Sequence, residues 1–201
     1  MLSLQDLLGP EQGTTALNEI SQNVGADQSS VNSAVQAALP MLINGLANNA
    51  SDPQGAQSLN TALETDHDGS ILDNLGGLGG MIFGQQAAAP RQADAGGILG
   101  HILGNNQGQA AQQVSNQTGL QTGQVAQIMM MLAPIVMGYL GRQKQQQGVG
   151  ADGLGGLLGG LLGGGQQAIP QRQSGGFLDQ DGDGSQMDDI ASMAFNYLRN
   201  R

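Results

Sequence analysis

Apolar residues are most concentrated between Leu120 and Gly141. Within this segment they recur at the three- and four-residue spacing of one helix face, from Val125 through Leu132 to Leu140. Three methionines and an isoleucine occupy the remaining faces of the same helix. Because a helix that is apolar on all sides is buried rather than laid on a surface, this segment predicts the central core helix of the protein.

A similar pattern occurs earlier in the chain, shifted by 94 residues (20 to 114 and 31 to 125). The sequence ISQNVG at 20–25 matches VSNQTG at 114–119, and seven apolar positions and one proline stay in register. A match of this length is typical of duplicated supersecondary units that bury their apolar faces together. We therefore predict an all-α, multihelical fold with an internal two-fold repeat packed around the buried apolar helix.

Each copy of the repeat indicates a short helix, a Gly at its C-terminal end and a longer helix. Pro40 and Pro134 are the aligned prolines, and both fall inside the longer helices. A proline removes one backbone hydrogen bond and clashes with the preceding turn, so we expect a kink in both helices. The alternative is that each proline separates two helices. The predicted helices span about 11–23, 29–48, 107–117 and 122–143.

Changes in composition along the chain predict its domain organisation. Segments rich in Gln, Ala and Pro favour linkers. The Leu-Gly-Gly tracts also favour linkers, because each Gly costs a helix about 1 kcal/mol relative to Ala. We expect the Gly-rich C-terminal linker to be mobile. The predicted segments are the first helical repeat with an Asp-rich loop (1–83), a linker (84–97), the second helical repeat, which packs with the first as one domain (98–147), a Gly/Gln-rich linker (148–176), and a DxDGDG loop with an amphipathic helix (177–201).

Composition and charge narrow the classes of protein. The chain has no Cys, which excludes disulfides and thiolate chemistry, and its formal net charge of −10 argues against a nucleic-acid or anionic-membrane surface. The apolar run 128–140 is shorter than the roughly 20 residues that a membrane-spanning helix needs, and no secretory signal is visible. We therefore expect a cytoplasmic protein without a membrane span.

The strongest chemical motif is DQDGDGS at 179–185. Its three carboxylates stand at the places of positions 1, 3 and 5 of a calcium loop. A Gly follows at position 6, where the chain turns sharply, and position 7 supplies a backbone carbonyl. The motif departs from such a loop at its end, where Met187 stands at position 9 and Ile190 at position 12, the place of a bidentate Glu. The alternative is an Asx-type turn that caps the next helix. The candidate Ca²⁺ ligands are Asp179, Asp181, Asp183, Ser185, Asp188 and Asp189.

A related acidic loop lies 115 residues earlier in the chain (66 to 181). It repeats part of the Asp spacing, but His67 takes the place of a Gly. With fewer ligands available, helix capping is the favoured interpretation of this loop. Its weaker candidate ligands are Asp66, Asp68 and Asp73.

The helix–Gly–helix spacing around Gly25 and Gly119 is also that of a helix-turn-helix DNA reader. A recognition helix must bring cations and hydrogen-bond donors to phosphates and bases, yet residues 26–50 and 120–141 contain no Arg or Lys. We therefore expect no nucleic-acid partner and keep DNA binding as a third candidate function.

Catalytic motifs are missing from the sequence, including G-x-S-x-G, Walker A, H-E-x-x-H and C-x-x-C. The Gly-rich tracts lack the Lys, Ser or Thr that a phosphate loop needs. His101 lies in the apolar turn ILGHILG, where we expect a partly buried, structural side chain. These observations predict a protein that is not an enzyme.

Several short motifs follow one another in a distinctive order. They are DHDGSILD at 66–73, GILGHILG at 97–104, Thr118-Gly119, LAP at 132–134, and a Gly/Leu-rich tail before DQDGDGS at 179–185. In this order they resemble the YidB-like bacterial proteins of unknown function, over about 17–141 and the tail. The resemblance implies an all-helical fold and a bacterial source, and it brings no catalytic or binding residue.

Two classes of function are favoured. The first is a self-associating structural or scaffold protein, which we expect to be a homo-oligomer. The chain has few charges, duplicated units, and methionines of the kind that pack adaptably at interfaces. In this hypothesis Met130, Met131 and Met137 face a second copy, unless the chain's own segments cover them. The alternative is a calcium-responsive binding module that uses the C-terminal DxDGDG loop.

Overall fold

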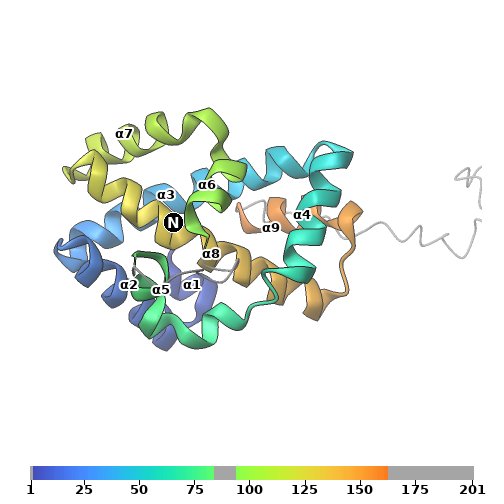
Figure 1. Cartoon of the computed structure of the whole chain (residues 1–201), viewed down its shortest axis with the longest axis horizontal. Helices are drawn as coiled ribbons and strands as arrows, with labels where there is room; N and C mark the ends of the chain where they lie inside the picture. The colour runs from blue at the N-terminus through green and yellow to red at the C-terminus, as the bar shows by residue number, and fades with distance from the viewer. Residues whose placement is uncertain (1, 84–93, 163–201) are drawn as a thin grey trace, which may run out of the picture. The chain divides into compact units, whose positions relative to one another are not determined.

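The computed structural model of the chain describes residues 2–83 and 94–162, which are helical almost throughout and contain no strand. These residues all belong to one compact unit, residues 1–165. The all-α class is therefore confirmed. The helices in chain order (Figure 1) are α1 (Leu4–Leu8), α2 (Pro10–Val24), α3 (Gln28–Ala50), α4 (Pro53–Thr65), the 3₁₀ helix η1 (Ser70–Gly77), α5 (Leu78–Phe83), α6 (Ala95–Leu103), η3 (Gly104–Asn106), α7 (Gln107–Thr118), α8 (Thr122–Gln147), η4 (Ala151–Gly153) and α9 (Leu154–Leu161).

The predicted core helix is α8, which packs against α2, α3, α4, α5, α6 and α7. Val125, Met131 and Ala133 lie on different faces of this helix and are each 0% exposed. The prediction of a helix buried on all sides is therefore confirmed. By length and composition alone α8 could cross a membrane, but 67% of its most apolar window is buried inside the unit. This burial is that of a core helix, so α8 gives no clear membrane span.

Both prolines lie within continuous helices, Pro40 in α3 and Pro134 in α8. The alternative that they separate pairs of helices is therefore wrong. Each long helix follows a short one across a glycine, Gly25 with φ 65° and Gly119 with φ 75°. In this left-handed conformation, which favours Gly, the amide of each glycine donates to the carbonyl of Ser21 or Ser115 and ends the short helix. The common ancestry of the two helix pairs stays a prediction from the sequence.

The Gly-rich segment after α8 is ordered where the structure describes it. Leu154 and Leu158 of α9 are 1% and 0% exposed, and α9 packs against α3. The four glycines of α9 lie on its exposed side. The expected mobility of 148–176 is therefore wrong for 151–161, because the two leucines stand four residues apart on one face. Burying an apolar side chain of this size contributes about 1.5–3 kcal/mol, which offsets much of the cost of the glycines.

The boundary between the two helical segments also differs from the prediction. Helix α6 begins at Ala95 with Asp94 as its N-cap, so the second segment starts before residue 98. The surrounding Gln-, Ala- and Pro-rich composition is that of a linker, but Asp94 is a good capping residue and begins the helix. The rest of the predicted linker (84–93) and the DxDGDG loop with its six candidate calcium ligands lie outside the described residues.

The methionines of α8 are covered by the chain itself. Met131 is 0% exposed, Met137 is 4% exposed, and Met130 is half-buried against the core. Helices α2, α3, α4, α5, α6, α7 and η1 pack on α8. Of the two alternatives, the structure supports burial within the chain's own core, so these side chains offer no ready interface to a second copy.

Candidate functional site

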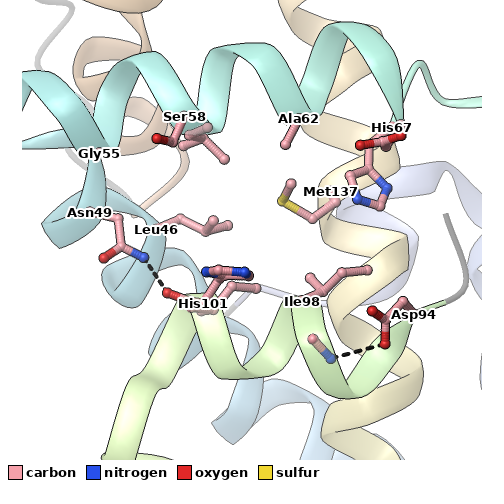
Figure 2. Close-up of a pocket in the computed structure, with 14 residues that line it drawn as sticks. Leu46, Asn49, Gly55, Ser58, Ala62, His67, Asp94, Ile98, His101 and Met137 are labelled. Atoms are coloured by element: carbon pink, nitrogen blue, oxygen red, sulfur yellow. Dashed lines mark hydrogen bonds between the residues drawn. The ribbon is translucent and has the colours of Figure 1, made fainter. Parts of the chain in front are cut away.

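A cavity of about 550 Å³ lies between α4 and α6 (Figure 2). Figure 2 shows α4 and α6 as facing walls, with Met137 of α8 between them. A volume of this size is within the range of small-molecule sites, which are typically lined by apolar groups and a few polar ones. The lining residues are Leu46, Asn49, Gly55, Ser58, Leu59, Ala62, Asp66, His67, Asp94, Gly97, Ile98, His101, Ile102 and Met137.

Capping residues fix where the two wall helices begin. Asp52 Oδ2 accepts the Gly55 amide at 3.0 Å at the start of α4, and Pro53 occupies its first turn. Asp94 Oδ1 accepts the Gly97 amide at 3.1 Å at the start of α6. Each cap satisfies an amide that the first helical turn would otherwise leave unpaired.

A contact between α3 and α6 closes one end of the cavity. Asn49 Nδ2 donates to the His101 carbonyl at 2.6 Å (Figure 2). A Cβ on Gly45 of α3 would stand 2.5 Å from the Ile102 carbonyl oxygen, so only a glycine allows the two backbones to come this close. The His101 side chain itself is exposed on the helix α6, so the expectation of a partly buried residue in a turn is wrong.

His67 is the buried polar side chain of the cavity. It is 4% exposed, and Nδ1 of its ring has no hydrogen-bond partner. Figure 2 shows the ring on the cavity side of the α4 C-terminus, beside Met137. Leaving a buried polar atom unpaired costs about 1–3 kcal/mol, and such atoms are uncommon in folded proteins. The position of this atom at a cavity wall is what a hydrogen-bonding ligand would require.

Burial also sets the charge of His67. Desolvation lowers the pKa of His67 below its usual value, and the nearby carboxylates of Asp66 and Asp68 partly oppose this effect. The pKa of Asp68 is itself lowered because its carboxylate accepts the Ser70 amide. The imidazole of His67 is therefore neutral at neutral pH, with one ring nitrogen able to accept a hydrogen bond.

The charged groups of the cavity are all acidic. Asp66 and Asp94 belong to its lining, and no Lys or Arg does. The cations of the described residues are used elsewhere: Arg142 pairs with Asp73 at 2.9 Å. Lys144 pairs with Glu64 at 2.5 Å. The charged side chains of the lining are therefore carboxylates, which favour a cation over an anion in the cavity.

The weaker calcium candidates do not form one cluster. Asp68 accepts the Ser70 amide at 3.0 Å, whereas Asp73 is held by Arg142 of α8. Asp66 is the C-terminal cap of α4. Residues 2–83 and 94–162 hold no group of three or more Asp, Glu, His or Cys side chains placed to bind a metal ion. The Asp68 carboxylate thus holds the turn before η1 and the Asp73 carboxylate ties η1 to α8, whereas Asp66 ends α4 through its backbone amide.

No pattern in the sequence predicts the cavity. Its lining comes from α3, α4, α6 and α8 and from the loop after α4, so no contiguous motif encodes it. One signal was available, namely His67 standing where the second acidic loop has a Gly. This difference places a large, hydrogen-bonding side chain where the other loop has none, which indicates that the side chain makes contacts of its own.

The described unit is thus an all-helical domain with a ligand-sized cavity between its helices. By sequence, residues 6–143 match a family described as bacterial protein of unknown function (DUF937), and the chain belongs to that family. The resemblance to YidB-like proteins is confirmed, because YidB is a member of this family. No curated protein and no solved structure matches the chain.

Proposed function

We propose that this protein is a non-enzymatic binding module that receives a small, largely apolar ligand in the cavity between α4 and α6. The observation that carries the proposal is the unpartnered Nδ1 of the buried His67 at the wall of a cavity of about 550 Å³. A ligand that pairs this atom removes the cost of leaving it unpaired. Apolar lining residues such as Ile98 and Met137 supply the nonspecific part of the affinity.

The polar groups of the cavity support binding rather than catalysis. Ser58 is the one hydroxyl among the lining residues, and His67 is the buried base. Figure 2 places Ser58 and His67 toward opposite ends of the wall formed by α4. A nucleophile and its base act within hydrogen-bond reach of each other, an arrangement that this pair does not have.

Binding of N-phenyl-1-naphthylamine, a neutral apolar fluorophore, tests the proposal. We expect its fluorescence to rise and saturate with one equivalent of protein. Ala62→Phe fills the cavity from α4 and should abolish the rise, whereas Thr61→Phe places the same ring on the exposed side of α4 and should leave it unchanged. Equal binding by both variants would show that the fluorophore sits elsewhere and would overturn the proposal.

Self-association into a scaffold is a second candidate, and one observation favours it. Met81 and Phe83 at the end of α5 are 37% and 41% exposed, the large hydrophobic side chains exposed among the described residues. Exposed apolar side chains of this size are of the type that interfaces cover. We propose α5 as the contact surface in place of the methionines of α8. DNA binding is the weakest candidate, because Arg142 and Lys144 are both held in ion pairs.

A further inference from the structure

We propose that the cavity between α4 and α6 selects ligands that carry a cationic amino group at the end of an apolar chain. This inference rests on the proposed function and adds the chemistry of the ligand to it. The observation behind it is the combination of an all-acidic set of charges with a buried, unpartnered ring nitrogen at the same cavity. An ammonium group satisfies both, since it carries positive charge and donates hydrogen bonds.

The polar groups gather at one end of the cavity. Asp66 and His67 follow the last turn of α4, and Asp94 precedes the first turn of α6 on the facing wall. Figure 2 shows His67 and Asp94 at this same end, whereas Asn49 and Ser58 lie at the other. The C-terminus of α4 adds the negative end of its helix dipole to the two carboxylates. This end of the cavity is therefore where a cation is most stable.

The ring of His67 provides the hydrogen-bond acceptor for such a group. Because burial keeps the imidazole neutral, Nδ1 can accept an ammonium N–H without repelling its charge. The rest of the cavity suits a hydrocarbon chain, since Leu46, Leu59 and Ile102 join Ile98 and Met137 in its lining. A volume of about 550 Å³ accommodates a chain of about ten carbons.

Three probes that share one chain and differ in the head group test the inference. Decylamine, decanol and decanoate are titrated into the full-length protein by calorimetry, each below its micelle concentration and at neutral pH. We expect decylamine to bind about tenfold more tightly than decanol, because it adds a charge-assisted hydrogen bond, and decanoate to bind most weakly.

A matched pair of variants locates the selectivity. Asp94→Asn removes a charge from the cavity but keeps a good N-cap for α6, so the fold is retained. It should weaken decylamine binding about threefold and leave decanol unchanged, as expected for an exposed carboxylate. Asp52→Asn makes the same change at the N-cap of α4, outside the cavity lining, and should alter neither affinity.

The possible results separate the two proposals. Equal affinities for amine, alcohol and carboxylate, or equal effects of the two variants, would overturn the selectivity for a cation while leaving the cavity as an apolar binding site. Failure of all three probes to bind would overturn the binding site itself and the inference with it.

Discussion

At the scale of single residues, His67 connects three parts of the molecule. Its amide donates to the Ala62 carbonyl at 3.0 Å and ends α4. Its own carbonyl lies directly against Gly141 of α8. Its ring borders the cavity with Nδ1 unpartnered. The side chain is therefore fixed by backbone contacts on two sides, and its polar atom is available to a ligand.

Titration of His67 should make folding stability depend on pH. Its pKa is lowered in the folded protein, so between that value and the unfolded value of about 6.5 the unfolded chain binds more protons. The free energy of unfolding should therefore fall as the pH drops below about 6.5. Asp66 and Asp68 beside the ring weaken the effect without reversing it, and Asp94 faces the ring from the other wall of the cavity. Urea unfolding at pH 7.0, 6.0 and 5.0 measures the slope.

Two Gln variants assign this slope to one histidine. His67→Gln should flatten the fall in stability between pH 7 and 5. His101→Gln, which changes an exposed histidine of α6, is the matched control. The readout is the slope of the free energy of unfolding against pH. A general loss of stability in His67→Gln shifts this curve without changing its slope. An unchanged slope in that variant would contradict the assignment.

The calcium hypothesis also belongs to the residue scale. Asp179, Asp181 and Asp183 supply three carboxylates, but the loop lacks the bidentate Glu at its end, so we expect a weak dissociation constant of about 10⁻⁴–10⁻³ M. Calorimetry on the full chain should give heat with millimolar calcium, and Asp181→Asn with Asp183→Asn should remove it. Asp66→Asn with Asp68→Asn is the matched control. Wild-type protein that gives no heat would end the hypothesis.

Few of the residues that line the cavity can be predicted from the sequence. The regular Asp spacing drew attention to Asp66, Asp68 and Asp73, of which only Asp66 lines the cavity. Asp94 falls within a segment of linker composition, and His67 is a departure from the motif of the second acidic loop. A cavity depends on which side chains from distant segments are placed together, and helix periodicity contains no information about that placement.

At the scale of helices, the sequence predicted the long elements well and the Gly-rich ones poorly. The predicted helix at 122–143 corresponds to α8 (Thr122–Gln147), and that at 29–48 to α3 (Gln28–Ala50). Both have an apolar pattern long enough to define a helix and a cap or glycine at each end. Helix α9 was missed because its Gly content outweighs two leucines in local propensity, whereas in the fold those leucines are buried on α3.

Two Gly→Ala substitutions in helices should change stability in opposite directions. In Gly141→Ala, the new methyl collides with the His67 backbone carbonyl, so we expect a loss of about 1–3 kcal/mol. In Gly155→Ala, the methyl meets open space on the exposed side of α9, so we expect a gain of about 0.5–1 kcal/mol from reduced backbone entropy. Thermal unfolding should show a lower melting temperature for the first variant and a higher one for the second.

The same pair of variants tests whether α9 is part of the folded unit. If α9 were not helical in solution, Gly155→Ala would leave the melting temperature unchanged. If the loop after α4 could move away from α8, Gly141→Ala would be tolerated. Ligand binding measured on Gly141→Ala adds a second readout, because the collision displaces His67 and should weaken binding in the cavity.

At the scale of the whole molecule, ion pairs tie α8 to the segments around it. Arg142 donates to Asp73 of η1 and to the Gly69 carbonyl, and Lys144 donates to Glu64 of α4. Lys144 is 7% exposed, so the cation of this ion pair is largely shielded from solvent. Both cations of the described residues thus serve the fold. The expectation that duplex DNA is not a partner stays a prediction, which the formal net charge of −10 supports.

Self-association should depend on α5 and not on the methionines of α8. If Met81 and Phe83 form the contact, Met81→Gln with Phe83→Gln should convert an oligomer into a monomer with unchanged helix content, since both side chains are exposed. In Met130→Gln with Met131→Ala the expected result is loss of stability, about 2–5 kcal/mol for Met131→Ala, because that side chain is 0% exposed in the core. Light scattering and urea unfolding of both variants separate the two effects. A wild-type protein that is monomeric at high concentration would reject the scaffold role and leave ligand binding in the cavity as the proposed function.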